Sequence, residues 1–260
     1  MRCFVGVMVV ATWTVGCSDP GSSAPTERAN GSSPGTPETE TEITGGWTTP
    51  TTKPGTTTTK DTAPPPSSAR CTQVIGYSQV GMPDGGWFVT GEVFEAIVDD
   101  DHWQLLWNSG GGVDRWQDPS YEGWSQPIQS PCSEGSDAPD RVLLSVSGPY
   151  GEDEQAWLDA ILATIDEIES RMPSVEEIVL QPVVGGPGEQ ACPSSGGGAV
   201  RASWQHSHID AAIAMAVGGE VTAGASPEVA DCTDYADGLG HLVPEAAEAI
   251  AAELGAYYAE

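Results

Sequence analysis

The sequence predicts an α/β fold in which a five-stranded, mostly parallel sheet carries helices on both faces. Short apolar runs alternate with amphipathic stretches from residue 71 to the end of the chain. Strands that alternate with helices in this way are typical of a parallel sheet covered on both sides. About 190 residues lie in this part of the chain, which is enough for one substantial hydrophobic core.

The predicted strands are short apolar runs that end near glycine, serine or proline. The third run is centred on Val142-Leu143-Leu144, and the fourth is closed by Gly-Gly-Pro-Gly. The fifth is the shortest of the set. Together the predicted strands cover residues 72–77, 103–107, 141–147, 177–184 and 220–225.

The predicted helices are longer stretches with helical spacing of apolar residues. The clearest lies at residues 152–171, where Trp157, Ile161, Ile165 and Ile168 recur on one face and Pro173 follows the end. The next is rich in alanine, and the last closes the chain. The full set covers residues 87–98, 152–171, 200–217 and 244–258.

Residues 1–16 are predicted to be a signal peptide rather than part of the fold. Arg2 supplies a positive charge, and residues 4–15 form a mostly apolar run that is too short to span a bilayer. The run ends in Thr-Val-Gly-Cys, which resembles a bacterial lipobox with threonine in place of the usual leucine, and this resemblance makes Cys17 the lipidated residue. Ser18 then implies sorting to the outer membrane. The alternative is an ordinary secretory signal followed by a chance cysteine.

Residues 17–70 are predicted to be a disordered tether. The segment consists largely of Thr, Pro, Gly, Ser and Glu, with Trp47 as its one aromatic residue. Such a composition buries too little apolar surface to offset the entropy of ordering the chain. Its expected role is to hold the folded domain, residues 71–260, away from the membrane surface.

The remaining cysteines predict two disulfides. An even number of cysteines in an exported domain favours disulfide bonds, and none of these cysteines has the short spacing of a zinc site. Three pairings are possible. We favour Cys71–Cys132 and Cys192–Cys232, because the members of each pair should lie at the same end of the sheet.

The chain is strongly acidic, and this excludes some partners. Its formal net charge is −29, and no lysine follows Lys60. Binding of nucleic acid is therefore excluded, since phosphate contacts require a positive surface. Highly anionic substrates are disfavoured as well, and a neutral glycan ester fits the charge better. The acidity is alternatively explained as a device for solubility.

Two short motifs at opposite ends of the domain supply the groups of a serine nucleophile. Ser78 follows the first predicted strand in Gly-Tyr-Ser-Gln, and Asp237 and His241 lie in Asp-Gly-Leu-Gly-His near the end. A serine needs a base to become a nucleophile, and the base needs an acceptor that orients it. The non-catalytic alternatives are that the serine forms a turn or a helix cap, that the histidine lies on the surface and that the aspartate is solvated.

The predicted topology brings these motifs to one edge of the sheet. Ser78, the glycine-rich residues 108–112, Gly148 and residues 237–241 follow the first, second, third and fifth strands. Ligands in open α/β sheets bind beyond the carboxyl ends of the strands. The sequence therefore predicts a site at this edge.

Over residues 71–260 the chain resembles the SGNH/GDSL hydrolase superfamily. Gly76 and Ser78 match the first block of that family, and Asn-Ser-Gly-Gly-Gly at residues 108–112 resembles the second. The resemblance implies a flavodoxin-like three-layer αβα sandwich and the cleavage of acyl or acetyl esters. It also implies that backbone N–H groups of Ser78 and of Gly111 or Gly112 stabilise the oxyanion.

The sequence departs from the family pattern at two points. The third block, Gly-x-Asn-Asp, supplies an oxyanion-binding asparagine, but Tyr150 stands at that place here, where its hydroxyl could donate instead. Loss of one oxyanion donor typically lowers turnover by about 100- to 1000-fold. In addition, Asp237 precedes His241 by four residues rather than the usual three.

Two clusters contain side chains that can bind metal ions. His206 and His208 lie two apart on a predicted helix, and residues at that spacing do not share a face. Asp231, Asp234 and Asp237 could hold Ca²⁺, but their loop lacks an EF-hand pattern. No metal ion and no organic cofactor are therefore expected.

The sequence favours an exported, lipid-anchored serine esterase of SGNH type that acts as a monomer. Trp116 and Trp124 flank the glycine-rich loop and are core residues by default, although they could form a sugar-stacking wall. The alternative function is a catalytically degenerate SGNH fold that acts as a binding module on the cell surface. A purely structural envelope lipoprotein would have no pocket at the carboxyl edge of the sheet.

Overall fold

The core of the fold is a five-stranded sheet in which every strand pair is parallel. The structure, a computed structural model, describes residues 71–98, 100–133, 138–188 and 191–259. The strands follow the order β2-β1-β3-β4-β5, with β1 at the point where the direction of winding reverses. They are β1 (Thr72–Gly76), β2 (Trp103–Trp107), β3 (Arg141–Val146), β4 (Glu177–Pro182) and β5 (Val221–Ala223).

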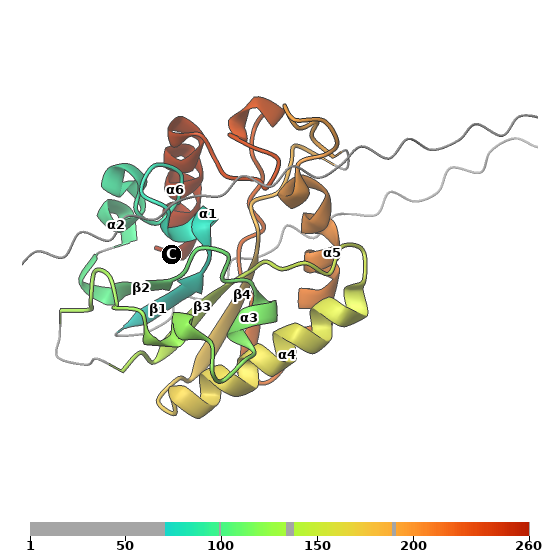
Figure 1. Ribbon diagram of the computed structural model, residues 1–260. Coiled ribbons are helices and arrows are strands. Elements are labelled where there is room, and N and C mark those ends of the chain that lie inside the picture. The colour runs from blue at the N-terminus through green and yellow to red at the C-terminus, as the bar shows by residue number, and fades with distance from the viewer. Residues whose placement is uncertain (1–70, 99, 134–137, 189–190, 260) are drawn as a thin grey trace, which may run out of the picture. The chain divides into compact units, whose positions relative to one another are not determined.

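Helices cover the sheet on both faces and complete a three-layer α/β sandwich. In Figure 1, α2 and α6 lie on one face, while α3, α4 and α5 lie on the other. The α-helices are α1 (Ser78–Gly81), α2 (Val93–Val98), α3 (Val113–Trp116), α4 (Glu154–Arg171), α5 (Arg201–Ala216) and α6 (Pro244–Tyr258). Short 3-10 turns occupy Thr90–Glu92, Asp100–His102, Glu122–Ser125 and Cys232–Asp234.

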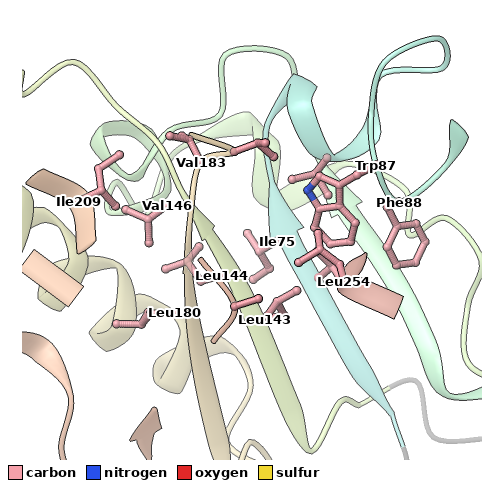
Figure 2. Close-up of a cluster of buried hydrophobic side chains, with 14 of the residues drawn as sticks. Ile75, Trp87, Phe88, Leu143, Leu144, Val146, Leu180, Val183, Ile209 and Leu254 are labelled. Carbon is pink, nitrogen blue, oxygen red and sulfur yellow. The ribbon is translucent and has the colours of Figure 1, made fainter. Parts of the chain in front are cut away.

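The apolar strands bury both of their faces, as the uninterrupted runs predict. Leu143 and Leu144 point to opposite sides of β3, and both are at most 1 % exposed. Figure 2 shows Leu143 near Trp87 and Leu254 on one side of the sheet, with Leu144 and Leu180 on the other. Two apolar layers therefore hold the sandwich together.

The predicted helix at residues 87–98 is the least accurate element. The α-helix begins only at Val93, and Trp87 and Phe88 lie in the preceding turn, where their backbone N–H groups donate to Gln79 and Val80. Both rings are fully buried. Gly91, with φ of 66°, interrupts the helical path between that turn and α2. The other predicted elements differ from the structure only at their ends.

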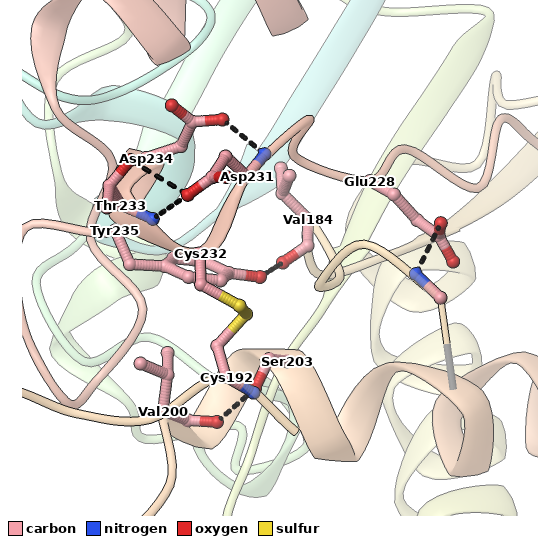
Figure 3. Close-up of a disulfide and its surroundings, with 11 residues drawn as sticks. Val184, Cys192, Val200, Ser203, Glu228, Asp231, Cys232, Thr233, Asp234 and Tyr235 are labelled. Atoms are coloured by element: carbon pink, nitrogen blue, oxygen red, sulfur yellow. Dashed lines mark hydrogen bonds between the residues drawn. A yellow bond between two sulfur atoms is a disulfide. The ribbon is translucent and has the colours of Figure 1, made fainter. Parts of the chain in front are cut away.

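The two disulfides have the pairing that we favoured. Cys71–Cys132 joins the residue before β1 to the segment between the 3-10 turn Glu122–Ser125 and β3, and Cys192–Cys232 joins the loop before α5 to the last 3-10 turn. Figure 3 shows the second bridge, next to Tyr235, whose hydroxyl donates to the carbonyl of Val184 at 2.9 Å. Cys232 of this bridge lies shortly before Asp237 and His241 in the sequence.

Removal of either disulfide is expected to destabilise the fold by a similar amount, because the bridges span 61 and 40 residues. Loop-closure entropy predicts about 4 kcal/mol for each bridge. Only the double variant Cys192→Ser/Cys232→Ser should also impair the site, since this bridge anchors the segment that leads to His241. Urea unfolding of both double variants measures the loss of stability, and the reactivity of Ser78 in each variant measures the effect on the site. Equal residual activity in the two would contradict the expectation.

The predicted signal peptide, Cys17 and tether, residues 1–70, lie outside the described residues. Among the described residues, no helix is long and apolar enough to cross a membrane.

Candidate active site

Ser78 stands directly beyond the carboxyl end of β1, at the first residue of α1. The turn between strand and helix is so tight that a Cβ on Gly76 would lie 2.5 Å from Val80 Cγ2 and 3.3 Å from Ser145 Cβ. Only glycine fits this close approach. The helix returns across the strand end, and Ser78 is 7 % exposed. As the first residue of a helix, its backbone N–H has no partner within the helix.

The loop that carries His241 is built around the Asp237 carboxylate. Asp237 Oδ1 accepts hydrogen bonds from the backbone N–H groups of Leu239, Gly240 and His241 at 2.9, 3.1 and 3.2 Å. Gly240 has φ of +102°, and a Cβ there would lie 2.4 Å from Ala202 Cβ, so the loop requires glycine at this position. The four-residue spacing is thus closed into a single hydrogen-bonded turn.

The structure brings the three predicted side chains into one hydrogen-bonded chain. Ser78 Oγ lies 2.7 Å from His241 Nε2, and His241 Nδ1 lies 2.6 Å from Asp237 Oδ2. With Asp237 ionised, Nδ1 carries the proton and donates to the carboxylate, which leaves Nε2 free to accept from the serine hydroxyl. The Ser78 side chain is buried, whereas Asp237 is 42 % exposed at its side chain.

Asp237 is held in its charged form by its hydrogen bonds. Burial by itself would raise the pKa of Asp237, but the His241 ring and the backbone N–H groups of His241 and Leu239 donate to it and lower the pKa below its usual value. The carboxylate therefore stays ionised across the neutral range. A fixed negative charge at this place keeps the imidazole in the tautomer that can accept a proton from Ser78.

Gln79 connects the turn that carries Ser78 to the loop that carries His241 through hydrogen bonds. Its side chain is 1 % exposed, its Nε2 donates to the carbonyl of Gly240 at 2.6 Å, and its Oε1 accepts from the backbone N–H of Val184 at 2.8 Å. The hydroxyl of Tyr77 donates to the same Oε1 at 2.5 Å. One buried amide thus links α1, the segment after β4 and the loop before His241.

Replacing Gln79 by leucine is expected to lower both stability and activity. The change leaves the carbonyl of Gly240, the N–H of Val184 and the Tyr77 hydroxyl without their partner, which should cost about 3 kcal/mol or more. Displacement of the His241 loop by about 1 Å should lower kcat/KM by roughly 100-fold.

Gln104→Leu is the matched control. That buried amide donates to Gln73 Oε1 and accepts from the N–H of Cys132. Its loss should lower the free energy of unfolding while kcat/KM stays near the wild-type value. Chemical unfolding and steady-state kinetics of both variants make the test. Equal kcat/KM in the two variants would remove Gln79 from any positioning role.

A cavity of about 430 Å³ opens beside Ser78 and His241 at the carboxyl edge of the sheet. It lies where the loops after β1, β2 and β3 meet, at the reversal point of the strand order, which is the usual binding place in such sheets. Its lining combines small, polar and charged residues: Tyr77, Ser78, Ser109, Gly110, Gly112, Asp114, Arg115, Ser147, Gly148, Pro149, Val183, Arg201, Ala202, Gln205, Leu239 and His241.

The glycine-rich loop does not offer the free N–H groups that we expected. The N–H of Gly111 donates to the carbonyl of Asn108 at 2.9 Å, and that of Gly112 donates to Gly110 at 3.0 Å. The loop closes on itself as a tight turn, so both donors are already engaged. Gly112 lines the cavity, whereas the carbonyl of Gly111 accepts from Trp116 Nε1 at 2.6 Å.

Tyr150 does not occupy the place of an oxyanion-binding side chain. Its ring packs edge-on against Trp157 of α4, with centroids 5.2 Å apart, and its hydroxyl accepts from Gln117 Nε2 at 3.3 Å. It is not among the residues that line the cavity. The physical reason is that an apolar surface on α4 attracts the aromatic ring. The hydroxyl thus lies against Gln117 and away from the residues that line the cavity, and its role as an oxyanion donor stays a prediction.

The two tryptophans near the glycine-rich loop have packing roles. Trp116 is fully buried and meets Trp124 edge-on at a centroid distance of 4.8 Å, and the Arg171 guanidinium stacks on Trp124. Neither ring is among the residues that line the cavity.

The side chains of the two candidate metal clusters make other contacts. His206 Nε2 lies 3.0 Å from Ser226 Oγ, while His208 Nδ1 lies 3.2 Å from a Glu154 carboxylate oxygen. The carboxylates of Asp231 and Asp234 accept from backbone N–H groups at the start of the last 3-10 turn. Over the described ranges, no three His, Cys, Asp or Glu side chains are grouped so as to hold a metal ion.

Gln79, Asp114, Arg115 and Arg201 belong to the site but were not predicted as site residues from the sequence. Gln79 follows Ser78 directly, and a polar residue between two apolar segments was the only signal. Arg201 and Asp114 line the cavity from the starts of α5 and α3. Arg201 is one of only four arginines after residue 70, and it lies at the start of a predicted helix. These two features were the signal by which it could have been identified.

Comparison with known proteins does not identify a family for this chain. No family model matches it, and neither the curated proteins nor the solved structures give a significant match. The geometry of Ser78, His241, Asp237 and their cavity is therefore the basis for any functional conclusion.

Proposed function

We propose that this chain is an exported, lipid-anchored serine ester hydrolase of SGNH type. The observation that carries the proposal is the hydrogen-bonded chain from Ser78 through His241 to Asp237 at the edge of a 430 Å³ cavity. Its order and geometry are those of an activated serine nucleophile. The substrate class is an acyl or acetyl ester, including esters of carbohydrates.

In this mechanism Ser78 Oγ attacks the ester carbonyl while its proton moves to His241 Nε2. The tetrahedral intermediate collapses to an acyl-serine, and the leaving alcohol takes that proton from His241. A water molecule then attacks the acyl group, again with His241 as base, and the free acid leaves as Ser78 Oγ regains a proton. Asp237 stabilises the imidazolium at both stages. The backbone N–H of Ser78 is the oxyanion donor that this arrangement retains.

Labelling with a neutral fluorophosphonate probe tests the proposal. The phosphorus forms a bond to an activated serine oxygen and expels fluoride, and peptide mass mapping then locates the adduct. We expect it on Ser78. Ser226 is the matched comparison, because it also contacts a histidine but donates its hydroxyl to Asp210 Oδ2 at 2.7 Å, so the imidazole does not accept its proton. A folded chain that stays unlabelled, or carries the adduct elsewhere, would overturn the proposal.

A second candidate function is a binding module on a hydrolase scaffold. The observation in its favour is that the N–H groups of Gly111 and Gly112 are engaged within their own loop. Without them the oxyanion has little support, and turnover would be slow. A chain that binds a glycan ester but neither hydrolyses it nor takes up the fluorophosphonate probe would favour this alternative.

A further inference from the structure

The cavity holds an unusual share of the positive charge of the folded part of the chain. Only four arginines, and no lysine, lie after residue 70. Arg141 stacks on Trp103 and Arg171 on Trp124, so both are used in packing. The other two arginines, Arg115 and Arg201, line the cavity that contains Ser78 and His241.

Arg201 is held in place by neutral partners. It is the first residue of α5; one of its Nη atoms donates to the carbonyl of Gly148, and its Nε donates to Gln205 Oε1 at 3.2 Å. Within the part of the chain that the structure describes, no carboxylate lies within ion-pair distance of its guanidinium. The side chain is partly exposed. Its neutral partners fix the position of the guanidinium without neutralising its positive charge.

Two carboxylates lie near the cavity, and among the described residues neither of them forms an ion pair with Arg201. Asp114 is the one carboxylate among the lining residues, against two guanidinium groups. Burial raises the pKa of Asp114, while the charges of Arg115 and Arg201 act to lower it. Asp237 is engaged with His241 and the backbone of its own loop. The charge of Arg201 also reaches Tyr77, the residue before Ser78, where it opposes the effect of burial on the phenol pKa.

The geometry points to an ester substrate that carries a carboxylate, bound by Arg201 with help from Arg115. This inference rests on the proposed function and names the substrate class of the same site. The planar guanidinium is suited to a carboxylate because it can donate two parallel hydrogen bonds. The net negative charge of the whole chain favours a neutral substrate. At physiological ionic strength, however, salt screens charges that lie more than about 8 Å apart. The two arginines that line the cavity therefore decide which charge binds there.

Matched pairs of esters test the inference by their kcat/KM ratios. The pair 3-acetoxybenzoate and 3-acetoxybenzamide places the charge on the alcohol side, and 4-nitrophenyl hemisuccinate and succinamate place it on the acyl side. We expect the wild type to prefer the carboxylate in one pair by roughly 10- to 100-fold. Added salt should reduce that preference. A ratio near one, or preference for the amide, in both pairs would overturn the inference while the hydrolase function stood.

Three arginine variants assign the preference to its residue. In Arg201→Gln the ratio should fall to near one, and in Arg201→Lys it should be intermediate, because the charge remains but the forked geometry is lost. Arg171→Gln removes the same charge away from the cavity and should keep the wild-type ratio. Thermal unfolding verifies that each variant is folded. A ratio that survives in folded Arg201→Gln would contradict the assignment.

Binding to Ser78→Ala separates failure of this inference from failure of the proposed function. Calorimetry compares 3-acetoxybenzoate and hemisuccinate esters with their amides on this variant, with and without Arg201→Gln. Tighter binding of a carboxylate that depends on Arg201 supports the anion site, whether or not the wild type hydrolyses esters. Equal binding of carboxylates and amides overturns it.

Discussion

Replacing Ser78 by alanine is expected to lower kcat/KM for ester hydrolysis by about 10⁴-fold or more. His241→Ala should cause a loss of the same order, because Ser78 Oγ has its proton acceptor at 2.7 Å in that ring. Residues that act as one unit are not additive, so the double variant should be no slower than the poorer single variant. The residual rate reflects binding and the remaining oxyanion donor.

Steady-state kinetics of the two single variants and the double variant measure this coupling. Ser226→Ala is the control, since it removes a hydroxyl that also contacts a histidine, His206, outside the cavity. Its kcat/KM should match the wild type. Multiplicative losses at Ser78 and His241 would mean that the two side chains act independently, and the proposed relay would then be wrong.

Most of the fold could be predicted because its core is encoded by local pattern. Strands buried on both faces are uninterrupted apolar runs, and the 103–107 run coincides with β2. The helix over Pro244–Tyr258 likewise has the predicted ends, with proline at its first turn. The segment from Trp87 failed because its apolar rings are placed by backbone contacts to Gln79 and Val80. Those contacts are tertiary, and no helical periodicity reports them.

The candidate site likewise has a part that the sequence predicts and a part that it does not. Ser78, Asp237 and His241 could be proposed together because parallel topology sends loops to one edge of the sheet. The oxyanion donors could not be predicted from the sequence, because they depend on the direction of individual N–H groups. In the loop that begins at Asn108, the N–H groups donate to carbonyls of the same loop. The position of Tyr150 within a motif likewise does not reveal that its ring packs against Trp157.

Asp237 has two roles that an isosteric change can separate. One oxygen organises the loop by accepting three backbone N–H groups, and the other accepts from His241 Nδ1 at 2.6 Å. In Asp237→Asn the carbonyl oxygen can still accept from the loop, but the amide must donate toward Nδ1. The imidazole then carries its proton on Nε2, where it donates to Ser78 instead of accepting from it.

Asp237→Asn is therefore expected to lower kcat by about 10⁴-fold while the fold and the loop persist. Asp234→Asn is the matched control: it makes the same change of charge in a neighbouring carboxylate that accepts from the N–H of Asp231, so its kcat should stay near wild type. Proton NMR of the His241 ring reports the tautomer, and kinetics report the rate. A folded Asp237→Asn chain with wild-type kcat would show that the four-residue spacing serves only to shape the loop, and that Ser78 is not activated through this histidine.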